Sequence, residues 1–151
     1  MPKTIISDTS CFIILSNIGE LDLLQKIYGR VLTTIEVADE FGEPLPDWVE
    51  IKGAADKYTK RILELQLDKG EASAIALALE SAPCSIILDD YKARKIAANL
   101  GLEITGTIGV IIKAKLNGII PSVKPYLEKI RNTDFRITDE IELQALKEAG
   151  E

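Results

Sequence analysis

The chain has 151 residues and a formal net charge of −6, with 46% apolar and 28% charged residues. Its length suits one domain with a single sizeable core, and its composition is that of a folded globular protein. Histidine is absent and only two cysteines occur, Cys11 and Cys84, which excludes Ser-His-Asp and Cys-His catalytic sites, histidine-bound zinc and four-cysteine metal sites.

The two cysteines show no CxxC spacing, so we expect both to be reduced, buried and without a catalytic role. No apolar run approaches the roughly 20 residues of a membrane span, and none resembles the apolar core of a signal peptide. We therefore expect a cytoplasmic protein that does not contact a membrane. The net acidity argues against a general polyanion-binding surface, unless metal ions lie between the protein and phosphate groups.

Short β-branched runs alternate with helical stretches, a pattern typical of an α/β protein with a mainly parallel sheet. The expected strands are residues 4–7, 30–33, 48–51, 85–88 and 102–104. The expected helices are residues 11–15, 21–28, 35–41, 56–67, 71–81, 91–100 and 107–116, and two terminal helices over 121–131 and 139–149. Without a repeat or a linker, residues 1–151 are predicted to form one domain, with 121–151 as a C-terminal helical extension.

Carboxylates stand just past the carboxyl ends of predicted strands. Asp8 follows the first strand, and Asp89 and Asp90 follow strand 85–88. In open α/β sheets, ligands bind in the crevice outside these strand ends. Each acid also has a structural interpretation: Asp8 suits a helix N-cap, and one of the adjacent aspartates could cap the helix that follows.

Further acids lie on predicted helices. Glu71 is placed in a first helical turn, where the helix macrodipole alone favours it. Glu36 and Glu40 are four residues apart and share a helix face, which points either into the crevice or to solvent. Thr107, in Gly106-Thr107-x-Gly109, is a good N-cap for the helix that it opens, and the same helix start would offer N–H groups to an anion.

Five short motifs follow one another along the chain. They are Asp8-Thr9-Ser10, Val37-x-x-Glu40, Gly70-Glu71-x-x-Ala74-Ile75-x-Leu77-Ala78, Leu88-Asp89-Asp90-x-x-Ala93-Arg94-x-x-Ala97 and Gly106-Thr107-x-Gly109. Together they resemble a PIN domain, and more narrowly a prokaryotic PIN-like subfamily predicted to bind nucleic acid and related to VapC-type toxins. The resemblance runs from about residue 5 to about residue 118 and is most specific around Glu71 and Asp89-Asp90.

This resemblance implies a Mg2+- or Mn2+-dependent ribonuclease with a central parallel sheet of about five strands flanked by helices. The catalytic acids carried over are Asp8, Glu40, Glu71 and Asp90. The implied metal ligands are Asp8, Glu71, Asp89 and Asp90. Asp89 competes with Asp90 for one position, and Glu36 competes with Glu40 for another. Many toxins of this type have aspartate where this chain has Glu71, whose side chain is one methylene longer, so the resemblance implies a different spacing at the second metal site.

The chemistry of the residues agrees with the resemblance, because Mg2+ and Mn2+ prefer hard oxygen ligands. Single-stranded RNA is the expected substrate, with Ser10, Thr107, Lys92 and Arg94 as candidate substrate-binding residues. Lys95, Lys113 and Lys115 could extend a basic rim, although a solvated helix face explains them as well. Aromatic residues make up only 5% of the chain, so an extended base-stacking platform is not expected. Toxins of this type also bind a small antitoxin protein and form homodimers.

Two other functional classes remain open on the residues alone. One is a catalytically silent module that keeps the fold and binds nucleic acid or a protein. The other is a receiver-like phosphoacceptor, which also combines paired aspartates, a hydroxyl and a lysine on a doubly wound sheet. A receiver would carry its acidic pair after the first strand and its lone aspartate after a middle one, whereas the order here is reversed.

Overall fold

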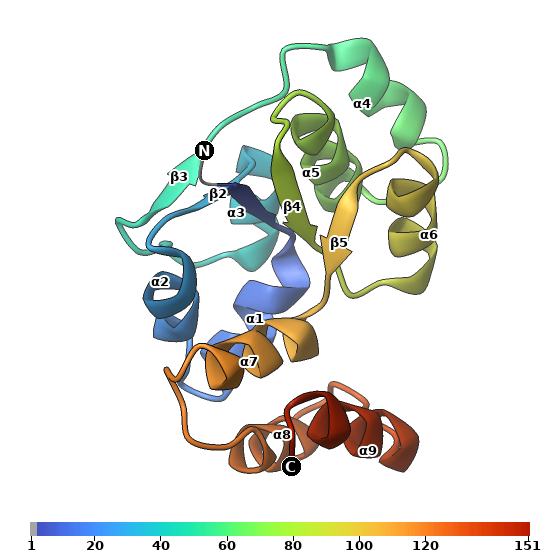
Figure 1. The fold of residues 1–151 in the computed structure, drawn as a ribbon. Helices are drawn as coiled ribbons and strands as arrows, with labels where there is room; N and C mark the ends of the chain where they lie inside the picture. The colour runs from blue at the N-terminus through green and yellow to red at the C-terminus, as the bar shows by residue number, and fades with distance from the viewer. Residues whose placement is uncertain (1–2) are drawn as a thin grey trace.

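The central element of the fold is a five-stranded sheet in which all neighbouring strands are parallel (Figure 1). The computed structural model describes residues 3–151. The strands are β1 (Thr4–Ser7), β2 (Val31–Thr33), β3 (Val49–Ile51), β4 (Cys84–Ile87) and β5 (Glu103–Thr105), in the spatial order β3-β2-β1-β4-β5. The predicted α/β fold with a mainly parallel sheet is confirmed.

The helices also follow the predicted order. They are α1 (Thr9–Asn17), α2 (Asp22–Tyr28), α3 (Ile35–Phe41), α4 (Lys57–Leu63), α5 (Lys69–Leu79), α6 (Tyr91–Asn99), α7 (Thr107–Leu116), α8 (Lys124–Arg131) and α9 (Asp139–Glu148). The largest difference is at α4, which ends at Leu63 rather than continuing to residue 67. In the turn that follows, Leu65 is 82% exposed, whereas Leu67 is buried in the core formed with α5 and α6.

Helix α5 begins two residues earlier than predicted. Its N-cap is Asp68, whose carboxylate accepts a hydrogen bond from the Glu71 amide at 2.8 Å. The Glu71 carboxylate in turn accepts from the Asp68 amide at 3.4 Å, which completes a capping box. Gly70 therefore lies inside the first turn of α5 rather than ahead of the helix.

Side chains of the central strands alternate between two hydrophobic cores. Ile5 and Ile87 face the core formed with α1, α2, α7 and the C-terminal helices, whereas Ile6 and Ile86 face the core formed with α5 and α6. Figure 1 shows these two helical layers on opposite sides of the sheet. Burial on both faces explains why the central strands are short runs of β-branched residues without polar alternation.

The C-terminal helices α8 and α9 lie beyond α7, at the end of the molecule farthest from α4 (Figure 1). Leu127, Ile130 and Ala145 are buried in the α1/α2/α7 core. The Lys115 ammonium donates to the Ala149 carbonyl, and the Glu151 carboxylate accepts from the Val123 amide at 2.8 Å. The helical extension predicted for 121–151 therefore shares a core with the rest of the fold.

Within residues 3–151, no helix has the length and apolar character needed to cross a bilayer.

The order of the strands creates a topological switch point between β1 and β4. The chain builds outward from β1 to β2 and β3, then crosses back to add β4 and β5 on the other side. The helices after β1 and β4 consequently leave in opposite directions, and a crevice opens at the carboxyl ends of these two strands. Asp8 and the Asp89-Asp90 pair stand at this edge, as expected from their positions after the strands.

Candidate active site

Asp8 is the most deeply buried acid of the crevice, with 4% of its surface exposed. It occupies the N-cap position of α1, yet its side chain makes no capping hydrogen bond. Its Oδ1 atom is buried and has no hydrogen-bond partner, and the same holds for Oγ1 of Thr9. Buried polar atoms are nearly always paired, so two adjacent unpaired oxygens call for an external partner. Asp8 is therefore the N-cap of α1 by position, as expected, but its carboxylate does not cap the helix.

Gly70 brings the two unpaired oxygens close to a second carboxylate. A Cβ atom placed on Gly70 would meet three oxygens: Glu40 Oε2 at 3.0 Å, Thr9 Oγ1 at 3.4 Å and Asp8 Oδ1 at 3.5 Å. The Cα of Gly70 is thus the floor of a small space lined by oxygen atoms from α1 and α3. Only glycine permits so close an approach of a backbone to these side chains.

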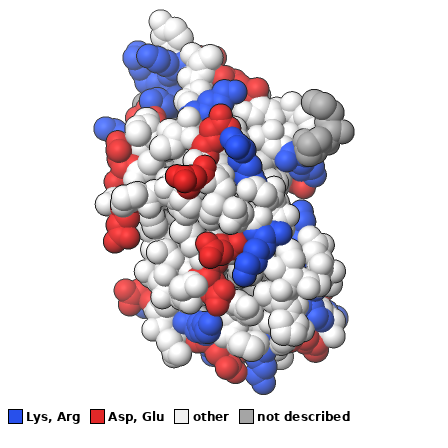
Figure 2. All heavy atoms as spheres, turned by 90° about the vertical axis from the view of Figure 1, so that its left-hand side faces the viewer, with Lys and Arg blue, Asp and Glu red and all other residues white. Residues whose placement is uncertain are grey.

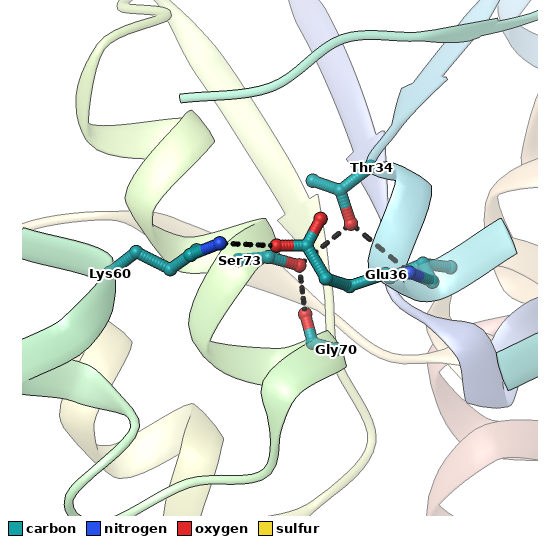
Figure 3. A network of polar contacts seen from close by, with 6 residues as sticks. Thr34, Glu36, Lys60, Gly70 and Ser73 are labelled. Atoms are coloured by element: carbon teal, nitrogen blue, oxygen red, sulfur yellow. Dashed lines mark hydrogen bonds and ion pairs between the residues drawn. The ribbon is translucent and has the colours of Figure 1, made fainter. Parts of the chain in front are cut away.

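A chain of hydroxyl groups fixes the position of Gly70 (Figure 3). Thr34 caps α3 by accepting from the Val37 amide at 3.2 Å, and its Oγ1 lies 2.7 Å from Oγ of Ser73. Ser73 donates to the Gly70 carbonyl at 2.8 Å, so Thr34 is the donor in the Thr34–Ser73 bond. Because Thr34 and Ser73 are buried, this network links the start of α3 firmly to the first turn of α5.

Burial and mutual repulsion raise the pKa of two acids in this cluster. Burial, followed by the charges of Glu71, Asp68 and Glu40, raises the pKa of Asp8 to about 7. The Thr9 amide, which lies near the carboxylate without hydrogen-bonding geometry, offsets part of this rise. Burial, followed by the charges of Asp68 and Asp90, also raises the pKa of Glu71 to about 7.

The structure thus brings together Asp8, Glu40, Glu71 and Asp90, which the sequence singled out, and adds Asp68. Asp68, two residues before Gly70, was not predicted as a site residue because it lies outside the motif that begins at Gly70. Its signal was nevertheless present, since Asp68-x-x-Glu71 has the spacing of a capping box. The same capping box that starts α5 therefore holds together Glu71 and Asp68, whose charges both act on Asp8.

Asp89 and Asp90 point toward different helices, which separates their charges. Asp90 caps α6 by accepting from the Ala93 amide at 2.9 Å. Asp89 accepts from both the amide and the hydroxyl of Thr107, at 2.8 and 2.6 Å. The charge of Asp90 contributes to the raised pKa of Glu71, whereas both oxygens of Asp89 are bound at the start of α7, so Asp90 is the one of the two that acts electrostatically on the cluster.

Two candidate substrate contacts have structural partners instead. Thr107 was expected as the N-cap of α7, but the N-cap is Gly106, and the Thr107 hydroxyl is bound to Asp89. Arg94 donates to the Leu88 carbonyl at 2.8 Å, so its guanidinium is directed at the end of the sheet. Lys92 is exposed in the first turn of α6, and Ser10 is half-buried in the first turn of α1. These last two side chains remain open to a substrate.

The basic rim considered near α7 does not form. The Lys113 ammonium lies 4.9 Å from the centre of the Tyr28 ring, and Lys115 binds the C-terminal helix. On the face drawn in Figure 2, basic and acidic side chains are interspersed rather than gathered by sign. Nucleic acid would therefore not be held by a broad basic surface on this face.

Glu36 is separated from the acidic cluster by its own ion pair. Its carboxylate lies 2.8 Å from the Lys60 ammonium of α4, as Figure 3 shows. Glu40, one turn later on α3, instead reaches the oxygen-lined space at Gly70. The geometry therefore favours Glu40 over Glu36 for the position that the sequence left open.

This difference predicts opposite results for two matched substitutions. Glu40→Gln should weaken divalent-metal binding, because it removes a charge that faces Asp8. Glu36→Gln should leave metal binding unchanged and cost less than about 1 kcal/mol of stability, since the Lys60 pair is partly exposed. Melting curves with and without Mn2+ measure both effects. A larger loss of the metal-induced shift in Glu36→Gln would reverse the assignment.

The raised pKa values also predict how stability depends on pH when no divalent metal is present. Between the unfolded pKa of about 4 and the folded pKa of about 7, the native state binds more protons than the unfolded state. The free energy of unfolding should therefore fall as pH rises from 5 to 8, which lowers the melting temperature by several degrees. A melting series in EDTA tests this, and the slope should flatten in Asp8→Asn. A melting temperature that increases over this range would contradict it.

The cluster fits a hard divalent cation by its donors and by its unpaired oxygen. All the converging side chains offer carboxylate or hydroxyl oxygen, which Mg2+ and Mn2+ prefer. Within residues 3–151, however, the acidic and thiol side chains form no group of three or more with the spacing of a bound metal ion. Carboxylates at close range repel one another without a countercharge, which is consistent with this open arrangement.

Both cysteines are free thiols, and burial raises the pKa of Cys11 to about 12.

Comparison with known proteins adds one result. A family model described as a PIN domain matches residues 4–151. No curated protein matches the chain. PIN domains are typically nucleases, hydrolases that act on nucleic acid and generally use divalent metals such as Mg2+. The match extends the resemblance seen in the motifs to the C-terminal helices, and it gives no support to a receiver-like phosphoacceptor.

Proposed function

The chain belongs to the PIN-domain family, and from that premise we propose that it hydrolyses phosphodiester bonds of single-stranded RNA with the help of Mg2+ or Mn2+. The observation that carries this proposal is the buried, unpaired carboxylate oxygen of Asp8, which faces Glu40 across Gly70. A carboxylate in such surroundings is costly unless a cation or a proton joins it. A divalent ion meets that need and brings a phosphate group to the same place.

The proposed roles follow from the position of each acid. Asp8 and Asp90 would be the central metal ligands. Glu40 and Glu71 would be additional metal ligands or would orient a water molecule. When bound, the metal supplies Lewis-acid activation of water and neutralises charge on the phosphate. Ser10, at the start of α1, would hold a phosphate oxygen. Asp89 and Thr107 would act together, because their paired hydrogen bonds hold the start of α7 against the end of β4.

The decisive experiment is an RNA cleavage assay. Labelled single-stranded RNA of several sequences should be cut in Mn2+ or Mg2+ and remain intact in EDTA. Duplex RNA of the same sequence serves as the substrate control. Intact RNA after long incubation of folded protein with Mn2+ would favour the alternative, a catalytically silent module that binds nucleic acid or protein.

The resemblance to VapC-type toxins supports a wider proposal about partners. The protein would be a cytoplasmic toxin, assembled as a homodimer and inhibited by a small antitoxin that enters the acidic crevice. Free thiols at Cys11 and Cys84 suit a reducing compartment. Copurification from the native host and light scattering test this part, with a small partner that blocks cleavage as the expected result. Active monomer without any copurifying inhibitor would contradict it.

A further inference from the structure

A groove of about 420 Å3 lies next to the hydroxyl network of Thr34 and Ser73, which are two of its lining residues. Helices α3, α4 and α5 and the segment after β3 line it. Three of its lining residues are lysines, Lys57, Lys60 and Lys69, and two are glutamates, Glu36 and Glu64. We call it the lysine groove. It is a locally basic site on a chain whose net charge is −6.

Two of the three lysines form no ion pair among residues 3–151. Lys60 pairs with Glu36 at 2.8 Å. For Lys57 and Lys69, no carboxylate lies within ion-pair distance among residues 3–151, although each follows the aspartate that caps its helix. Both occupy the first position of a helix, where the macrodipole disfavours a cation. A sequence that accepts this local cost twice in one groove indicates a role for the positive charge.

Gly70 connects the lysine groove to the acidic cluster. Its carbonyl accepts from Ser73, which lines the groove, while its Cα faces the oxygens of Asp8 and Glu40. Helix α3 spans the same boundary, with Glu36 on the groove side and Glu40 on the acidic side. Lys69 and Glu71, two residues apart at the start of α5, belong to the groove and to the cluster respectively. A chain of phosphates in the groove would therefore continue directly into the cluster.

We propose that the lysine groove binds the backbone phosphates of a single-stranded RNA immediately next to the bond that is cut. This inference rests on the proposed function, because it takes its substrate from there. The phosphate contacts position the strand without reading its sequence. They also offset the repulsion that the acidic cluster exerts on an approaching phosphate. Lys57 and Lys69 make the contacts, and Glu36 keeps Lys60 oriented.

RNA binding, rather than cleavage, is the readout of the test. Fluorescence anisotropy is measured with labelled single-stranded oligouridylate in full-length Asp8→Asn protein, which keeps the RNA intact and lowers the repulsion. Adding Lys57→Gln and Lys69→Gln should weaken binding by roughly 10-fold at low salt and reduce the salt dependence by about 0.7 per lysine in the log–log slope. Replacing both lysines with arginine should preserve affinity. Neither glutamine should harm folding, because each removes a cation from a helix start.

Matched controls separate this result from its alternatives. Lys26→Gln with Lys147→Gln removes the same charge from α2 and α9 and should leave binding nearly unchanged. Equal losses in both pairs would overturn the groove and indicate a general charge effect. Polyglutamate that binds as tightly as RNA, with the same dependence on Lys57 and Lys69, would also overturn it in favour of an acidic protein partner.

The outcomes also separate this proposal from the proposed nuclease function. If the wild type cuts RNA but these lysines do not affect RNA binding, the proposal for the lysine groove is wrong and the nuclease proposal holds. If the lysines are needed for RNA binding but the wild type cuts no RNA, the proposal for the lysine groove holds and the nuclease proposal is wrong.

Discussion

Asp8→Asn should abolish metal-dependent RNA cleavage while making the metal-free protein more stable. Burial and the surrounding acids raise the pKa of Asp8 to about 7, so its ionised form destabilises the fold at pH 8. Asparagine removes that charge and keeps the shape of the side chain. We expect the melting temperature in EDTA at pH 8 to rise by several degrees. Cleavage should fall by about 100-fold or more, since the central carboxylate for the cation is lost.

The measurement is a set of melting curves with and without Mn2+. Metal binds only the folded state, so it should raise the melting temperature of the wild type, and much less that of Asp8→Asn. Asp90→Asn is the paired variant: asparagine caps a helix as well as aspartate, so stability without metal should hardly change, while the metal-induced shift shrinks. Equal metal-induced shifts in all three proteins would remove the physical basis of the nuclease proposal.

The fold and the approximate place of the site could be read from the sequence because both depend on local patterns. The apolar run 85–88 is typical of a buried strand, which the structure has at Cys84–Ile87, and Asp8 and Asp90 then stand just past strand ends. The exact ends of helices were harder to predict from the sequence where a single tertiary contact or capping residue determines them. Helix α5 begins at Lys69 because Asp68 forms a capping box, not because hydrophobic periodicity starts there.

The sequence could not separate residues whose roles depend on distant partners. Glu36 and Glu40 share one helix face, and only Lys60 on α4 and Gly70 on α5 distinguish them. Arg94 resembles a phosphate ligand in the sequence, yet the carbonyl it binds becomes available only where β4 ends. In the same way, the two lysines proposed to contact phosphate lie at the starts of α4 and α5, not among the basic residues after Asp90.

These contacts suggest a common physical design. The buried hydroxyl network of Thr34 and Ser73 holds α3 and α5 rigidly together. The carboxylates of the acidic cluster therefore stay close to one another despite their mutual repulsion. Stability without metal is thereby lowered at neutral pH and is regained when a cation binds. Substitutions that relieve the repulsion should stabilise the protein and impair the site, which is the usual relation between stability and activity at functional centres.

Gly70→Ala should preserve the fold and disable the site. Gly70 lies in the first turn of α5 and has no positive φ, so alanine suits the backbone and favours the helix by about 0.5–1 kcal/mol. The added methyl, however, would come within 3.0 Å of Glu40 Oε2. Glu40 is exposed and flexible enough to move aside, which relieves the clash but takes its carboxylate away from Asp8. The methyl group would also occupy the oxygen-lined space itself.

We therefore expect Gly70→Ala to melt in EDTA at or slightly above the wild-type temperature and to lose most of the Mn2+-induced shift, with cleavage reduced at least about 10-fold. Gly53→Ala is the matched control, because Gly53 also lacks a positive φ and its Cβ would meet nothing within 4 Å. It should keep the full metal-induced shift. Circular dichroism confirms that both variants are folded, so that a lost shift reports on the site alone. A Gly70→Ala protein with wild-type metal response would mean that the cation does not bind in the space between Asp8 and Glu40, and the ligand set would then have to be sought around Glu71 and Asp90 instead.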